Sequence, residues 1–101
     1  MAEPPSEDAL REAVARLRVG DLLAQTLVSV VSLGYAKLEP GEGRDPEQAR
    51  LAVEAIRALT PVLTGAADEA LLRDLESARA SLQLAYARAV NEDRRENEPA
   101  G

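Results

Sequence analysis

The chain contains no histidine, cysteine, tryptophan or phenylalanine, and only two tyrosines and one lysine among its 101 residues. Histidine, cysteine and lysine supply most general bases, nucleophiles and nitrogen or sulfur metal ligands in proteins. Without cysteine the chain also has no disulfide and no thiolate. We therefore expect a protein that is not an enzyme, with no catalytic, cofactor-binding or metal-binding residues and no cofactor.

Positive charge is also scarce and dispersed. The 18 acidic and 12 basic residues give a net charge of −6, and only Arg94 and Arg95 are adjacent arginines. Nucleic-acid binding usually requires a basic stripe, and anionic membrane surfaces attract basic clusters. We therefore expect no nucleic-acid partner and no attraction to a lipid surface.

The most informative segment that is present covers residues 22–36, fifteen residues without a charge. As a helix it would be about 22 Å long, shorter than the ~30 Å hydrocarbon core of a bilayer. It also contains polar and small residues, namely Gln25, Thr26, Ser29, Ser32 and Gly34. The pattern favours a buried helix over membrane insertion, and the N-terminus lacks the basic region and apolar run of a signal peptide. We expect a cytoplasmic protein.

Apolar residues recur throughout with the period of a helix, which predicts an all-α fold. We expect disordered tails at residues 1–7 and 91–101 around one helical domain at 8–90. This domain is expected to be a small bundle of three main helices plus a short N-terminal helix, completed by dimerisation. The expected helices cover residues 8–18, 22–38, a segment starting at Pro46, and 67–90.

The ends of these helices carry recognisable signals. Ser6, Asp21 and Asp45 are predicted N-caps, with Gln48 completing a capping box after Asp45. Pro61 conflicts with a continuous third helix because proline has no N–H group. That helix therefore either ends near residue 59 or is kinked at Pro61.

Several of these features resemble the short bacterial proteins of the domain of unknown function 1844 family. The matching features are Ser32-Leu33-Gly34 at the end of the apolar helix, Asp45-Pro46, the helix 49–59, Gly65, Asp68-Glu69 and Leu82-Gln83-Leu84-Ala85-Tyr86. Pro61 departs from the continuous third helix of that family. The resemblance implies an all-helical fold and no assigned activity or catalytic residues.

The apolar helix 22–38 is the predicted interaction element. It is apolar around most of its circumference, apart from a strip formed by Gln25, Ser29, Ser32 and Ala36. We expect a homodimer that pairs this helix with its own copy, through Leu23, Leu27, Val28, Ser29, Val31, Ser32, Gly34 and Tyr35. The competing possibility is that the N-terminal helix folds back and places Leu10, Val14 and Leu17 over the same face.

These observations predict a non-enzymatic scaffold or adaptor that acts through protein–protein interaction with an unknown partner. The alternative is a bundle that binds a small apolar ligand or lipid. Other candidate sites are weak. Gly41-Glu42-Gly43 lacks the preceding strand of a phosphate loop, Ser29 and Ser32 lack a base, and Glu39, Glu42 and Asp45 would bind a divalent cation only weakly.

Overall fold

The computed structural model describes residues 6–98, and within them it contains four α-helices and no strand. The helices are α1 (Glu7–Arg16), α2 (Val19–Ala36), α3 (Pro46–Leu59) and α4 (Glu69–Glu96), with a 3₁₀ turn, η1 (Pro61–Leu63), after α3. The predicted all-α fold is confirmed. Residues 1–5 and 99–101 of the predicted tails lie outside the described residues.

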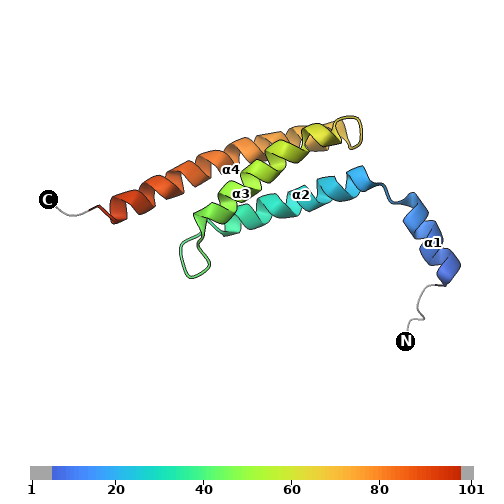
Figure 1. Cartoon of the computed structure of the whole chain (residues 1–101), viewed down its shortest axis with the longest axis horizontal. Coiled ribbons are helices and arrows are strands. Elements are labelled where there is room, and N and C mark those ends of the chain that lie inside the picture. Colours follow the sequence, from blue (N-terminus) through green and yellow to red (C-terminus); the bar gives the residue numbers. More distant parts are fainter. Residues whose placement is uncertain (1–5, 99–101) are drawn as a thin grey trace.

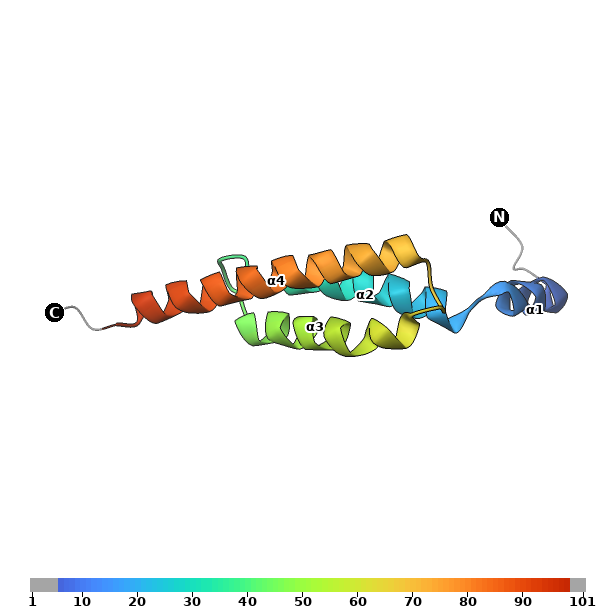
Figure 2. The same cartoon turned by 90° about the horizontal axis from the view of Figure 1, so that it is seen from above.

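Helices α2, α3 and α4 form the bundle, and α1 points away from it (Figure 1). Along the chain the three bundle helices run up, down and up, so α2 and α4 are parallel and α3 is antiparallel to both (Figures 1 and 2). The molecule measures 71 × 38 × 16 Å. It is therefore long and thin, and it has room for only a narrow core.

The core is entirely apolar and has two parts. One part contains Ala24, Leu27, Ile56, Leu63, Leu72 and Leu75, and the other contains Ala49, Ala52, Val53 and Leu82. Gly34 lies where α2 meets the second part: a Cβ at this position would be 2.8 Å from Leu82 Cδ2 and 3.1 Å from Ala52 Cβ. The missing side chain thus lets α2 approach α3 and α4 closely.

The boundary between α1 and α2 differs from the prediction. Ser6 caps α1 as expected, because its hydroxyl accepts a hydrogen bond from Ala9 N at 3.1 Å. The helical break falls at Leu17 and Arg18, both extended, whereas Gly20 and Asp21 lie inside the first turn of α2. The predicted Asp21 cap is therefore wrong. Gly20 instead allows α2 to pack closely against the backbone of Ala66, since a Cβ at this position would lie 2.1 Å from the Ala66 carbonyl oxygen.

Helix α3 starts and ends near the predicted positions. Asp45 occupies the N-cap position, but its side chain makes no capping hydrogen bond; its carbonyl accepts from Gln48 N at 3.0 Å. The predicted capping box is thus wrong, because the Asp45 side chain does not accept the hydrogen bond that a capping box requires. The helix ends at Leu59 and Pro61 begins η1, so the first alternative for Pro61 is confirmed. Gly65 then turns the chain with φ +81.

Helix α4 continues beyond the predicted end at residue 90, and the predicted disordered tail from 91 is wrong as far as Glu96. Arg44, in the loop before α3, contacts this part of the helix. Its guanidinium donates to the carbonyl of Leu38, to Ala89 O at 3.4 Å and to Asp93 Oδ1 at 3.0 Å. This side chain ties the loop to the C-terminal turns of α4, where Arg94 and Arg95 also suit the helix dipole.

The two aspartates at the N-cap positions of α3 and α4 offer a direct comparison. Asp68 accepts a hydrogen bond from Ala70 N at 3.0 Å, whereas the Asp45 side chain makes no such bond. We expect Asp68→Ala to lower the free energy of unfolding by about 0.5–2 kcal/mol, the usual effect of losing a cap. Asp45→Ala is the matched control and should lose less. Urea denaturation of both variants measures the difference, and equal losses would contradict it.

Candidate functional site

The structure divides the predicted interface residues between the core and the surface. Leu27 and Gly34 are buried within the bundle, and Leu23 and Val31 are half-buried against its core. Helices α3 and α4 cover Leu27, whereas Gly34 also lines an open groove beside α3. Their place in an interface stays a prediction. The other four residues are exposed: Val28, Ser29, Ser32 and Tyr35.

The outward surface of α2, here called the α2 outer face, consists of Leu22, Gln25, Ser29, Ser32, Leu33 and Ala36, all exposed. Its centre is the polar strip that the sequence showed. Two large apolar residues, Leu22 (62% exposed) and Leu33 (58% exposed), border this strip. Neither was among the predicted interface residues, because an apolar helix alone does not show which of its leucines its neighbours leave uncovered.

A groove runs between α2 and α3 beside this face. This groove, here called the α2–α3 groove, has a volume of about 390 Å³. It is lined by Val30, Leu33, Gly34, Gln48, Leu51, Ala52 and Ala55. Gly34 and Ala52 are buried, while Leu33 and Leu51 are exposed. The lining contains no charged residue, so an apolar helix could enter this groove without removing water from an ion.

A second groove lies on the opposite side of α2, against α4. It measures about 320 Å³ and is lined by Val28, Val31, Ser32, Leu71, Asp74, Leu75 and Ala78. Here Asp74 adds a charge that a partner would have to leave hydrated or neutralise. Ser32 donates to the carbonyl of Val28 at 3.3 Å, so its hydroxyl is used within α2. This groove is less suited to an apolar partner than the α2–α3 groove.

Helix α1 does not cover either groove. None of its residues is buried, and it lies beyond the N-terminal end of α2, away from the bundle (Figures 1 and 2). Leu10, Val14 and Leu17 are 51%, 65% and 69% exposed. The competing prediction of a folded-back N-terminal helix is therefore wrong for this structure, and the apolar stripe of α1 has no partner within the described residues.

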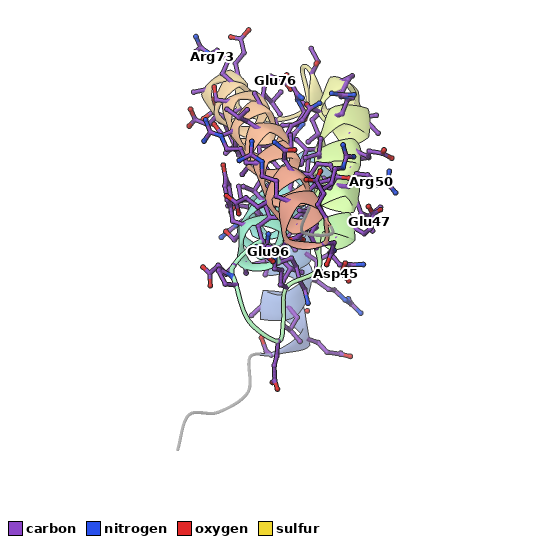
Figure 3. All side chains as sticks on the ribbon, turned by 90° about the vertical axis from the view of Figure 1, so that its left-hand side faces the viewer. Asp45, Glu47, Arg50, Arg73, Glu76 and Glu96 are labelled. Atoms are coloured by element: carbon purple, nitrogen blue, oxygen red, sulfur yellow. The ribbon has the colours of Figure 1, made fainter. Side chains whose placement is uncertain are left out.

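The charged side chains gather on the other helices. Those labelled around α3 and α4 include Glu47, Arg50, Arg73 and Glu76 (Figure 3). Arg50 pairs with Glu47 at 2.8 Å and with Glu54 at 2.7 Å. Hydrogen bonds from Arg79 lower the pKa of Glu76 from its ordinary value. These ion pairs give the outside of α3 and α4 a charged surface, and the α2 outer face has no equivalent.

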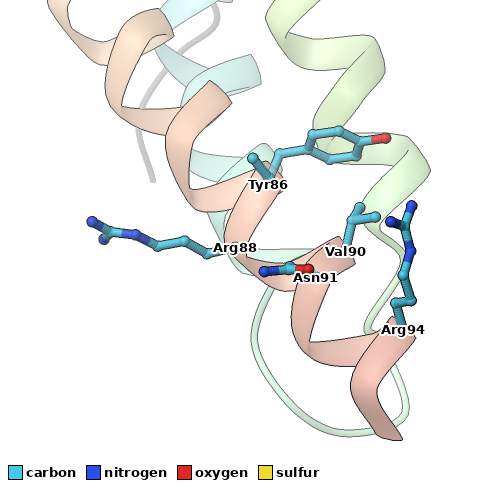
Figure 4. Close-up of a pocket in the computed structure, with 6 residues that line it drawn as sticks. Tyr86, Arg88, Val90, Asn91 and Arg94 are labelled. Carbon is cyan, nitrogen blue, oxygen red and sulfur yellow. The ribbon is translucent and has the colours of Figure 1, made fainter. Parts of the chain in front are cut away.

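Two further hollows offer little chemistry. One, of about 500 Å³, is lined by Tyr86, Ala87, Arg88, Val90, Asn91 and Arg94, all from α4, and its Tyr86 and Arg88 side chains point to opposite sides of the helix (Figure 4). Another lies between the 37–45 loop and α4 and holds Glu92, Asp93 and Glu96 beside Arg44. Among residues 6–98 no three acidic side chains are placed to hold a metal ion together.

Helix α2 (Val19–Ala36) is also long and apolar enough to cross a membrane, judged by length and composition alone. It is longer than the predicted segment because it begins before Gly20. Mostly buried core helices of soluble proteins pass the same test, but only 17% of α2 is buried. Helix α2 does pack against both α3 and α4. The absence of membrane insertion stays a prediction.

Comparison of the chain with protein-family models, with curated proteins and with solved structures finds no match. The resemblance to the domain of unknown function 1844 family thus stays a prediction. Any functional conclusion rests on the surface of the molecule itself, and the α2 outer face with the α2–α3 groove is its most distinctive part.

Proposed function

We propose that this protein is a non-enzymatic helical scaffold or adaptor that associates with a second copy of itself through the α2 outer face. The supporting observation is the excess of surface. The accessible area is 7660 Å², whereas a compact monomer of this mass would have about 5,500 Å². The radius of gyration is 18.7 Å, against about 13 Å for a compact chain of this length. A second copy would cover part of this surface.

The α2 outer face has the composition of a contact between helices. It combines Leu22 and Leu33 with the small residues Ser29, Ser32 and Ala36 and carries no charge. Leucines supply apolar area, at roughly 25 cal/mol per Å² removed from water, and small residues let two helices approach closely. A two-fold axis across this face would pair α2 with an antiparallel copy, the simplest closed arrangement.

Binding of a small apolar ligand or lipid is the second candidate, and the α2–α3 groove is the feature that favours it. The groove is open along the surface, and its lining includes one hydrogen-bonding side chain, Gln48. Small-molecule sites usually enclose most of the ligand and orient it with several polar groups. Self-association therefore accounts better for the exposed leucines.

Replacement of one exposed leucine tests the proposal. Leu33→Asp places a charge on the α2 outer face and should raise the dimer dissociation constant roughly a hundredfold or more, because an unpaired buried charge costs several kcal/mol. Leu84→Asp is the matched control, since Leu84 is 53% exposed on α4, and should leave the dimer intact. Sedimentation equilibrium measures both, and circular dichroism checks that each variant is folded.

The outcomes are distinct. A natural chain that remains monomeric at all concentrations would refute self-association, and equal weakening by Leu33→Asp and Leu84→Asp would place the contact elsewhere. A monomer that co-purifies with a stoichiometric apolar molecule would favour the ligand-binding alternative.

A further inference from the structure

The arm, defined as α1 together with Leu17, has an apolar stripe with regular spacing. Leu10, Ala13, Val14 and Leu17 stand at positions i, i+3, i+4 and i+7, so they share one side of a helix. This is the spacing with which an amphipathic helix anchors itself in an apolar groove. Leu10, Val14 and Leu17 are all more than half exposed. The arm therefore presents an apolar stripe of the kind that binds in a groove, and no other part of the described chain covers it.

The hinge holds the arm away from its own bundle. Leu17 has φ −71 and ψ 137, and Arg18 has φ −116 and ψ 135, so two consecutive residues are extended. An extended hinge directs the arm outward from the N-terminal end of α2 (Figure 1). Exchange of an identical element between two copies is a low-cost route to a dimer.

The arm is too short to fill the α2–α3 groove of its own chain. Leu33 lies fourteen residues after Val19, about 21 Å along α2. If the arm folded back, Leu10 would lie about 9 Å from the end of α1, and the two-residue hinge would add at most about 7 Å. Leu51 lies on the far side of the same groove, beside Ala52, which packs near Gly34. Intramolecular docking would therefore leave Leu33 and Leu51 uncovered.

We infer that the arm of one copy docks in the α2–α3 groove of a second copy, an inference that rests on the proposed self-association. When two α2 helices pair antiparallel, the N-terminal end of each lies beside the C-terminal end of the other. The hinge at Arg18 is then next to the partner's groove around Leu33 and Gly34. Each copy gives one arm and receives one, as two-fold symmetry requires.

The area of contact supports this exchange. The α2 outer face is about 27 Å long and one helix wide, so it offers roughly 270 Å² in projection, well below the ~800 Å² that each partner buries in a standard interface. The arm and the groove that receives it each add roughly 150 Å² per copy. Exchange thus about doubles the contact. Neither the apolar stripe of the arm nor the groove lining carries a charge. Docking of the stripe in the groove therefore buries no charged side chain of either surface.

Cross-linking between chains tests the position of the arm. The natural chain has no cysteine, so Val14→Cys and Leu51→Cys each introduce a single thiol. When these two full-length proteins are mixed and treated with a short bifunctional maleimide, a 14–51 link between chains should form at least roughly tenfold faster than a 15–51 link made with Ala15→Cys, because docking raises the effective concentration. Ala15 lies outside the stripe, about 100° around α1 from Val14, although it lines the same shallow hollow as Leu10 and Val14.

A charge in the arm provides the second readout. Val14→Glu should raise the dimer dissociation constant by roughly tenfold or more, whereas its neighbour Ala15→Glu should change it by less than about threefold. A wild-type dissociation constant for Val14→Glu, together with equal 14–51 and 15–51 rates, would overturn the exchange. If Leu33→Asp still dissociated the dimer in that case, the proposed self-association through the α2 outer face would stand without exchange of the arm. A monomeric natural chain would also overturn the exchange.

Discussion

Replacing Leu82 by alanine should lower the free energy of unfolding by about 2–5 kcal/mol, the range for large-to-small changes in a core. Leu82 is fully buried and packs with Ala49, Ala52 and Val53. These neighbours are small and cannot extend into the space that the isobutyl group leaves, so most of the cavity should persist. Urea denaturation at a constant protein concentration measures the loss, because any association also contributes to stability.

The matched control is two residues further along the same helix. Leu84 is 53% exposed, and Leu84→Ala should change the free energy of unfolding by less than about 0.5 kcal/mol. Similar losses at positions 82 and 84 would contradict the packing described for α4. Gly34→Ala adds a second check. Its Cβ would lie 2.8 Å from Leu82 Cδ2, so it should cost less in the Leu82→Ala background than in the natural chain.

Gly20→Ala should destabilise the protein by about 1–3 kcal/mol, the usual cost of overpacking. Helix propensity alone predicts the opposite sign, since alanine is better than glycine in a helix by about 0.5–1 kcal/mol. The new Cβ would lie 2.1 Å from the carbonyl oxygen of Ala66 and 2.9 Å from its carbonyl carbon. Backbone atoms cannot rotate away as a side chain does, so α2 and the turn before α4 would have to separate.

Thermal or urea denaturation of Gly20→Ala gives the sign directly. The control is Gly43→Ala, because no atom lies within 4 Å of the position where its Cβ would be. That variant should stay within about 0.5 kcal/mol of the natural chain. A more stable Gly20→Ala protein would show that α2 does not pack against Ala66 in solution.

The local sequence was sufficient for the helices themselves. Apolar spacing placed all four, Ser6 was correctly predicted as a cap, and Pro61 marked the region where α3 stops. Each of these features depends on neighbours within one or two turns. The wrong placement of the break between the expected helices 8–18 and 22–38 has the opposite origin. A glycine that breaks a helix and a glycine that admits a carbonyl oxygen from residue 66, as Gly20 does, look identical in the sequence.

The sequence by itself also determined that the second helix must be covered, because fifteen consecutive uncharged residues cannot all face water at low cost. Only the tertiary structure decided which side is covered. Helices α3 and α4 take Leu27 and Gly34 into the core and leave Leu22 and Leu33 outside. Likewise, Arg44 contacts Asp93 in the C-terminal part of α4, 49 residues away along the chain. Helix formation depends on local spacing, whereas burial depends on which segments meet in space.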